Sequence, residues 1–261
     1  MRANRRAARE TLACAAVGGV RSEEERIRAA YARRPVEDWR YSPFNPAHLL
    51  AMQQLETGML ALLRRNRRTQ LSSYRVLDVG CGAGRLLNRL LGWGAAPANL
   101  AGVDLLPDRI AEARSLLPAE VRLICASARQ LEFPAESFDL IFQLTVFTSI
   151  LDPELKRQIA AEMLRVLRPE GLIVWFDYHM NNPRNPDVRG VGKQKIRELF
   201  PGCRIELRRI TLAPPINRLL APWSPLLCQL LSRAPFLCTH YLGGICKASS
   251  GRGIGPSLTA E

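Results

Sequence analysis

The sequence predicts an α/β protein built on a doubly wound, parallel β-sheet. From Arg75 onward, short apolar runs alternate with segments of helical periodicity, which is typical of parallel strands joined by crossover helices. A glycine-rich turn follows the first of these runs, at residues 80–84. Asp152 and Pro153 open the most clearly signalled helix, because Asp is a favoured N-cap residue and Pro is favoured at the first helical position.

The composition agrees with one large folded domain. Of the 261 residues, 47% are hydrophobic and 23% are charged, which is enough to bury a substantial core. This excludes a disordered chain and a small disulfide scaffold. The seven cysteines are an odd number without a C-x-x-C pair, so the sequence predicts no metal site and favours a reducing, cytoplasmic location.

The first 74 residues are expected to form a basic tail and a helical cap. Residues 1–21 are rich in arginine and resemble a signal peptide only weakly, which predicts a basic N-terminal tail. Ser22 and Glu25 have the spacing of a capping box, which predicts a helix over about residues 22–33. Asn45 and Pro46 open a longer helix that runs to about residue 65. Residues 22–74 are therefore predicted to be an N-terminal helical cap.

The main domain is expected over residues 75–247. Apolar runs predict strands at 76–79, 100–105, 121–126, 138–144, 172–176, 204–212 and 241–247. Helical periodicity predicts helices at 85–91, 108–117, 153–167 and 193–200.

Two segments lie outside these elements: an apolar insert between the last two predicted strands and a tail after the last one. The charge-free stretches at 219–232 and 234–246, in and beside the Pro-rich apolar insert at 213–239, are too short and too interrupted by proline to span a membrane, so we expect a cover over the sheet edge or an interfacial segment. Residues 248–261, rich in Ser and Gly, are expected to be a disordered tail.

The glycine-rich turn carries the strongest functional signal. It reads DVGCGAG over residues 78–84, and Asp104 ends the next strand, where an acid can accept hydrogen bonds from both hydroxyls of a ribose. A dinucleotide loop normally reads G-x-G-x-x-G and holds a pyrophosphate, which the acidic Asp78 would repel. S-adenosylmethionine has no phosphate, and its ammonium and sulfonium groups suit an acidic site. The turn therefore predicts a nucleoside site of this kind.

Four ordered blocks make the sequence similar to a known family. They read RVLDVGCGAGRLL at 75–87, GVDLLPDRIAEAR at 102–114, LEFPAESFDLIF at 131–142 and EMLRVLRPEGLIVWFDY at 162–178. In this region, from about Arg75 to Phe176, the chain resembles the class I S-adenosylmethionine-dependent methyltransferases, and within them the group of methyltransferase type 11 domains. The resemblance implies a Rossmann-like, seven-stranded sheet whose last strand is antiparallel, with S-adenosylmethionine as cofactor.

The resemblance also implies a set of cofactor-binding positions. The glycine loop would line the methionine end of the cofactor, Asp104 would hold the ribose and Leu105 would pack beside the adenine. The cofactor residues expected in this way are Asp78, Gly80, Cys81, Gly82, Gly84, Asp104, Leu105, Ser127, Ala128, Arg129, Gln143 and Leu144. The family's third strand commonly ends in Gly-Asp-Ala, where this chain has Ala126-Ser127-Ala128. The hydroxyl of Ser127 can still accept a hydrogen bond from the adenine amino group.

The segment after the fifth strand is the expected acceptor side. Residues 177–187 read DYHMNNPRNPD, and ligands of open α/β sheets bind outside the carboxyl ends of the strands. His179 is the candidate general base, because the ordinary pKa of histidine suits proton abstraction at neutral pH. Asp177 and Tyr178 complete the candidate catalytic set. The alternative is that the Asn-Pro pairs only form consecutive turns.

The sequence leaves three functions open, and a fourth, a non-catalytic module that only binds the cofactor, is permitted without positive support. The first is O-methylation of a hydroxyl on a small molecule or glycan, since the polar loop suits a hydroxylated acceptor. The second is methylation of a lipid-like acceptor, such as a quinone or a polyprenyl-linked molecule. Here the apolar insert would form an apolar wall or touch the membrane surface, with the protein otherwise in the cytoplasm.

The third function is binding or modification of RNA, which the charge suggests. The net charge is +13, with 15 basic and 7 acidic groups over residues 1–75, 10 and 13 over 76–177, and 12 and 4 over 178–261. The basic flanks surround a slightly acidic centre, and Gln143-Leu144-Thr145-Val146 stands where enzymes that methylate base amino groups carry a proline-rich turn. The sequence therefore does not favour a nucleic-acid partner. It leaves the acceptor and the oligomeric state open.

Overall fold

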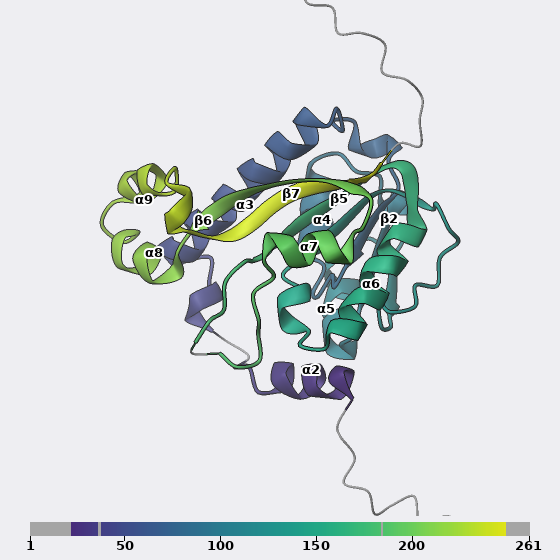
Figure 1. The fold of residues 1–261 in the computed structure, drawn as a ribbon, viewed down its shortest axis with the longest axis horizontal. Helices are drawn as coiled ribbons and strands as arrows, with labels where there is room; N and C mark the ends of the chain where they lie inside the picture. The colour runs from purple at the N-terminus through teal and green to yellow at the C-terminus, as the bar shows by residue number, and fades with distance from the viewer. Residues whose placement is uncertain (1–21, 36–37, 184, 249–261) are drawn as a thin grey trace, which may run out of the picture.

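A seven-stranded sheet forms the centre of the computed structural model, which describes residues 22–248 except 36–37 and 184 (Figure 1). The predicted tails at 1–21 and 249–261 lie outside the described residues. The strands are β1 (Val76–Val79), β2 (Leu100–Asp104), β3 (Arg122–Cys125), β4 (Phe138–Leu144), β5 (Leu167–Tyr178), β6 (Cys203–Leu212) and β7 (Cys238–Lys247).

Eight α-helices and five short 3-10 helices are described around the sheet. The α-helices are α2 (Glu23–Ala32), α3 (Pro46–Arg65), α4 (Arg85–Gly92), α5 (Pro107–Leu116), α6 (Pro153–Val166), α7 (Lys193–Leu199), α8 (Pro214–Leu220) and α9 (Pro225–Leu231). The 3-10 helices are η1 (Trp39–Tyr41), η2 (Leu71–Ser73), η3 (Pro97–Asn99), η4 (Phe147–Ser149) and η5 (Pro235–Leu237).

The strand order is β3-β2-β1-β4-β5-β7-β6. The first five strands pair in parallel, and β7 runs antiparallel to both of its neighbours, β5 and β6. This confirms the predicted doubly wound sheet with an antiparallel last strand. Because the order reverses between β1 and β4, the carboxyl ends of these two strands face the crevice where open α/β sheets bind ligands.

Each face of the sheet packs on its own layer of helices. Side chains alternate along a strand, so Ile173 and Trp175 of β5 face one side, with α6 and α7, while Val174 faces the other, with α3, α4 and α5. All three side chains are fully buried. The helical layers cover the faces and leave the carboxyl edge of the sheet for the site.

The two N-terminal helices begin where the sequence predicts. Ser22 and Glu25 form a reciprocal capping box at the start of α2, and the side chain of Asn45 accepts hydrogen bonds from the first turn of α3. Pro46 occupies the first position of α3, which needs no hydrogen bond from that residue. Helix α3 then packs on the sheet, whereas α2 lies across the carboxyl edge, where Ile27 packs against the core (Figure 1).

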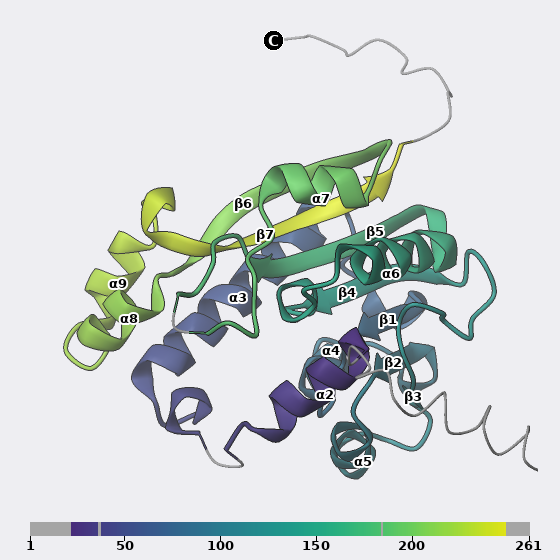
Figure 2. The same ribbon diagram turned by 60° about the horizontal axis from the view of Figure 1, so that its bottom comes forward.

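The apolar insert folds into α8, α9 and η5, and its buried side packs on the beginning of α3. Asn217 of α8 donates a 2.7 Å hydrogen bond to the carbonyl of Ala47, and Cys228 of α9 is buried in the same cluster. The insert therefore projects beyond the sheet instead of covering its edge (Figure 2). Among the described residues, no helix has both the length and the apolar character needed to cross a membrane.

Candidate functional site

A cavity of about 370 Å³ opens at the carboxyl ends of β1, β2 and β4, beside the end of β3. Its floor is the glycine loop that joins β1 to α4, and its sides come from the loops after β2, β3 and β4. Helix α2 contributes Glu24, Ile27 and Tyr31 from above. Its volume lies in the range of pockets that hold small ligands or cofactors.

The glycine loop has the backbone shape that only glycine adopts freely. Gly80, Gly82 and Gly84 have φ angles of 73°, 52° and 75°. A Cβ at Gly80 would collide with Val146, and one at Gly84 would lie 2.7 Å from the side chain of Leu117. Gly82 has open space around its Cα, so a ligand can approach the backbone there. A different structural constraint thus explains the glycine at each of these three positions.

Two carboxylates give the cavity its acidic character. Asp104 accepts hydrogen bonds from the backbone N–H of Gly82 at 2.8 Å and of Leu106 at 2.9 Å, which fix its orientation. Burial, opposed by these hydrogen bonds, raises the pKa of Asp104. Burial and the charge of Asp104 raise the pKa of Asp78 well above its usual value. Such a site favours a ligand that carries positive charge or donates hydrogen bonds over one that carries phosphate.

An orphaned carboxylate oxygen lies at the β3 end of the cavity. Oε1 of Glu24 is buried and lies 3.5 Å from Nε of Arg129, but it makes no hydrogen bond within the described part of the chain. Ser127, which lines the same end, accepts a weak 3.4 Å hydrogen bond from the N–H of Arg129. A buried carboxylate oxygen with an ion pair but no hydrogen bond can still accept one, so this end of the cavity suits a ligand with a hydrogen-bond donor.

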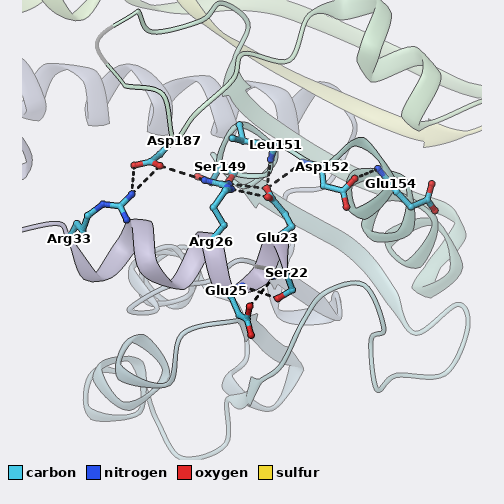
Figure 3. Close-up of polar contacts among 10 residues, drawn as sticks. All are labelled: Ser22, Glu23, Glu25, Arg26, Arg33, Ser149, Leu151, Asp152, Glu154 and Asp187. Carbon is cyan, nitrogen blue, oxygen red and sulfur yellow. Dashed lines mark hydrogen bonds and ion pairs between the residues drawn. The ribbon is translucent and has the colours of Figure 1, made fainter. Parts of the chain in front are cut away.

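Helix α2 is held over the cavity by a network of ion pairs (Figure 3). Glu23 accepts hydrogen bonds from Arg26 at 2.8 Å and from the backbone N–H of Leu151. Arg26 also donates a 2.6 Å hydrogen bond to the carbonyl of Ser149, and Arg33 pairs with Asp187 at 2.9 Å. Burial raises the pKa of Glu23, but the hydrogen bonds outweigh it and the net pKa is lowered. Glu23 is therefore ionised at neutral pH, as the network requires.

Most of the predicted cofactor residues come together around the cavity. Those that line it are Asp78, Gly80, Cys81, Gly82, Asp104, Leu105, Ser127, Ala128 and Leu144. Three others are not part of this lining: Gly84 packs on Leu117, Arg129 is exposed and pairs with Glu24, and Gln143 is fully buried, where its side chain accepts a hydrogen bond from the N–H of Val146. Burial also raises the pKa of the Cys81 thiol, so this cysteine is no thiolate nucleophile.

The three predicted catalytic residues lie at the end of β5, outside the lining of this cavity. Asp177 is fully buried and accepts hydrogen bonds from Thr148 and from the N–H of Tyr178. The Tyr178 ring packs on His240, with 3.7 Å between the ring centroids. Nε2 of His179 lies 2.9 Å from the carbonyl of Cys238, which makes Nε2 the protonated nitrogen and leaves Nδ1 to accept a proton.

Sequence reasoning missed the contribution of α2 and η4. Glu24, Ile27 and Tyr31 of α2 and Val146 and Ile150 beside η4 all line the cavity. The only available signal was the capping box at Ser22, which predicts the helix but says nothing about where it lies. The predicted cap therefore supplies part of the site.

The family comparison agrees with the geometry. Residues 76–171 match the family described as "Methyltransferase domain". The chain is 31% identical over 130 residues to the 2-methyl-6-phytyl-1,4-hydroquinone methyltransferase of Synechocystis, a match that covers 48% of this chain and 38% of that protein. It is 29% identical to a ubiquinone biosynthesis O-methyltransferase of Pseudomonas putida, over 62% of this chain and 66% of the relative. The chain thus spans less than two thirds of either relative.

Solved structures show the same fold. An S-adenosylmethionine-dependent methyltransferase from Archaeoglobus fulgidus superposes with a TM-score of 0.52 at 18% identity, over 76% of this chain and 98% of that one. Together with the matched domain, this confirms the predicted class I methyltransferase fold and family resemblance. The cofactor that the family implies is S-adenosylmethionine.

Proposed function

We propose that this chain, a member of the class I S-adenosylmethionine-dependent methyltransferases, transfers a methyl group to a hydroxyl of a small molecule or glycan. The observation that carries the proposal is the cavity at the carboxyl edge, where the glycine loop, Asp104 and the end of β3 converge within one matched domain. The relative from Pseudomonas putida is by name an O-methyltransferase, which supports oxygen as the accepting atom.

The residues of the cavity fit the cofactor. Asp104 would accept hydrogen bonds from the ribose hydroxyls, Leu105 would pack on the adenine, and the open backbone at Gly82 would receive the methionine end. The third strand offers only the hydroxyl of Ser127 as an acceptor for the adenine amino group. Oε1 of Glu24, which makes no hydrogen bond among the described residues, would be a second acceptor for that amino group. When bound, the cofactor supplies an electrophilic methyl group on a positively charged sulfur.

The chain's own residues must align the acceptor and take its proton. Nδ1 of His179 is the proposed proton acceptor, since Nε2 is already paired with the carbonyl of Cys238. Burial raises the pKa of Tyr178, so its phenol stays protonated and can donate a hydrogen bond to the acceptor. Asp177 would act through Thr148, as a positioning residue that holds η4 against the cavity. Alignment supplies most of the rate for a displacement of this kind.

A lipid-linked acceptor is the second candidate. Helices α8 and α9 expose the large apolar side chains of Leu219, Trp223, Leu226 and Leu230 at the same edge of the sheet as the cavity. The two quinone-pathway relatives act, by their names, on molecules of this kind. This candidate predicts that activity with a water-soluble hydroxylated acceptor rises when the same acceptor carries an isoprenoid chain.

Calorimetric titration tests the cofactor before any acceptor is known. We expect micromolar binding of S-adenosylmethionine or S-adenosylhomocysteine, no binding of NAD, and loss of binding in Asp104→Ala. Transfer of a radiolabelled methyl group to a panel of hydroxylated and prenylated acceptors then tests the reaction, with His179→Gln expected to lower kcat by about 100-fold or more. His48→Gln is the matched control. Absence of cofactor binding by the unaltered protein would rule the proposal out.

A further inference from the structure

The insert exposes an apolar surface that the fold does not cover. This insert face consists of Leu219, Trp223, Leu226, Leu230 and Phe236, and three of its members are almost fully exposed: Trp223 at 86%, Phe236 at 78% and Leu226 at 77%. Leu226 and Leu230 are four residues apart in α9 and so share one side of the helix. Several large apolar side chains exposed on one short segment mark an interaction site.

The insert face is not the result of a poorly packed segment. The opposite side of the insert is buried, where Cys228 and Ala221 join Leu50 of α3 and Leu212 of β6 in one cluster. The hydrogen bond between Asn217 and Ala47 fixes α8 to α3. The insert therefore has an inner side that belongs to the core and an outer side that meets its surroundings.

The charged side chains of the insert and of the strand segments beside it are all basic. The sequence contains no Asp or Glu between Glu206 and Glu261, whereas Arg209, Arg218 and Arg233 lie within or beside the insert. All three arginines are exposed. A segment that exposes both apolar side chains and arginines complements a surface that is apolar inside and anionic outside. A bilayer containing anionic lipids has this chemistry, because its headgroups attract arginine and its acyl chains accept the apolar side chains.

The insert face lies at the functional edge of the molecule. Strand β6 runs parallel to β5, because both pair antiparallel with β7, so the insert after Leu212 leaves the same edge of the sheet as the cavity loops. Figures 1 and 2 both show α8 and α9 projecting beyond this end of the sheet. Tyr178 at the end of β5 interacts electrostatically with Arg218 of α8 and with Tyr41 of η1. A membrane bound to the insert would therefore lie on the side of the molecule where β5 ends at Tyr178.

We infer that the insert face docks the protein on an anionic lipid bilayer, with α8 and α9 lying in the headgroup region and Trp223 at the interface. Each helix has 7 residues, far fewer than the roughly 20 needed to span the bilayer. Tryptophan is favoured at the boundary between headgroups and acyl chains. A second copy of the chain is a poorer occupant, because a two-fold interface would bring the same arginines together. This inference does not depend on the proposed reaction.

Vesicle sedimentation with the full chain tests the inference. The probes are vesicles of phosphatidylcholine alone and vesicles that also contain 30% phosphatidylglycerol. We expect the protein to bind the anionic vesicles, and the double variant Leu226→Ser, Leu230→Ser to bind them about tenfold more weakly or worse. The matched control is Leu60→Ser, Leu116→Ser, which removes two leucines of 43% and 45% exposure outside the insert and should bind as the unaltered protein does. All these proteins have the same net charge, so the attraction between their other basic segments and the anionic vesicles is the same in each.

A second readout locates the contact. Trp223→Phe should keep vesicle binding but lose most of the quenching of tryptophan fluorescence by lipids with brominated acyl chains. Unchanged melting temperatures establish that the variants are folded. Equal vesicle binding by the insert variant and its control would overturn the inference. So would sedimentation in the ultracentrifuge as a dimer that only the insert variant abolishes, since the face would then belong to a second copy.

Discussion

Thr148 donates a 2.6 Å hydrogen bond from its hydroxyl to Oδ1 of Asp177, and its backbone N–H donates to Oδ2 at 3.1 Å. Both side chains are buried, so this pair joins the end of β5 to η4 away from water. Its neighbours Val146, Ser149 and Ile150 line the cavity. The carboxylate of Asp177 thereby fixes a wall of the site without lining it.

Thr148→Val removes the hydroxyl with almost no change in volume. We expect the free energy of unfolding to fall by about 1 to 3 kcal/mol, because a buried carboxylate loses a charge-assisted hydrogen bond. Denaturant unfolding at neutral pH measures the change. Thr57→Val, at an exposed position of α3, should alter stability by less than about 0.5 kcal/mol. Equal stability of the two variants would show that the pair contributes nothing.

The titration of Asp177 should appear in the pH dependence of stability. Burial raises its pKa to about 6, although the hydrogen bonds from Thr148 and Tyr178 oppose the shift. The folded state therefore holds a proton that the unfolded state releases near pH 4. The protonated Asp177 side chain therefore stabilises the fold fully below about pH 4, and this stabilisation is lost as the pH rises through about 6.

Asp177→Asn separates this contribution from all others, because the amide does not titrate. As the pH rises from 4 to 6.5, we expect the unfolding free energy of the unaltered protein to fall relative to that of Asp177→Asn. Urea unfolding at half-unit pH intervals gives the difference directly. A difference that is constant across this range would contradict a raised pKa.

Glu24 should decide which nucleobase the proposed site accepts. The unaltered protein is expected to bind S-adenosylhomocysteine about 100-fold more tightly than S-inosylhomocysteine, because the inosine carbonyl would face the Glu24 carboxylate. Glu24→Gln keeps a carbonyl oxygen and adds an amide donor. This variant should reduce the preference to less than about tenfold, as measured by competitive calorimetric titration.

Arg129→Gln is the control for the Glu24 prediction. It removes the ion pair at 3.5 Å but leaves the carboxylate, so the preference for adenosine should persist. If the Glu24→Gln protein retains the full preference, then Ser127 alone reads the base and the role proposed for Glu24 is wrong.

The glycine loop was predictable from sequence because its constraints are local. Gly80 and Gly84 need positive φ angles within a seven-residue turn, and Asp104 follows from the end of the next strand. The position of α2 was not predictable, because Glu23 reaches Leu151 across 128 residues of chain. The strand β5 is also longer than its apolar run, and side chains alternate along it. Asp177 therefore turns inward to Thr148, which the sequence could not indicate.

The network beneath α2 should govern how long the cofactor stays bound. Arg26 joins Glu23, the carbonyl of Ser149 and Asp187, so Arg26→Ala removes one contact to each of two separate loops and leaves the contacts of Glu23 and Arg33 in place (Figure 3). Because Glu24 lies next to this anchor, we expect S-adenosylhomocysteine to bind about tenfold more weakly, mainly through a faster dissociation rate.

Arg28→Ala provides the comparison on the same helix, because Arg28 is exposed and the change in charge is identical. Stopped-flow displacement of the ligand should give the ordinary dissociation rate for Arg28→Ala and a faster one for Arg26→Ala. Lowering the pH should weaken the anchor in the unaltered protein as well. The pKa of Glu23 is held below its usual value, so its contribution is complete at neutral pH and is lost as the pH falls through that lowered pKa. Matching rates for the two variants would mean that α2 covers the cavity without retaining the ligand.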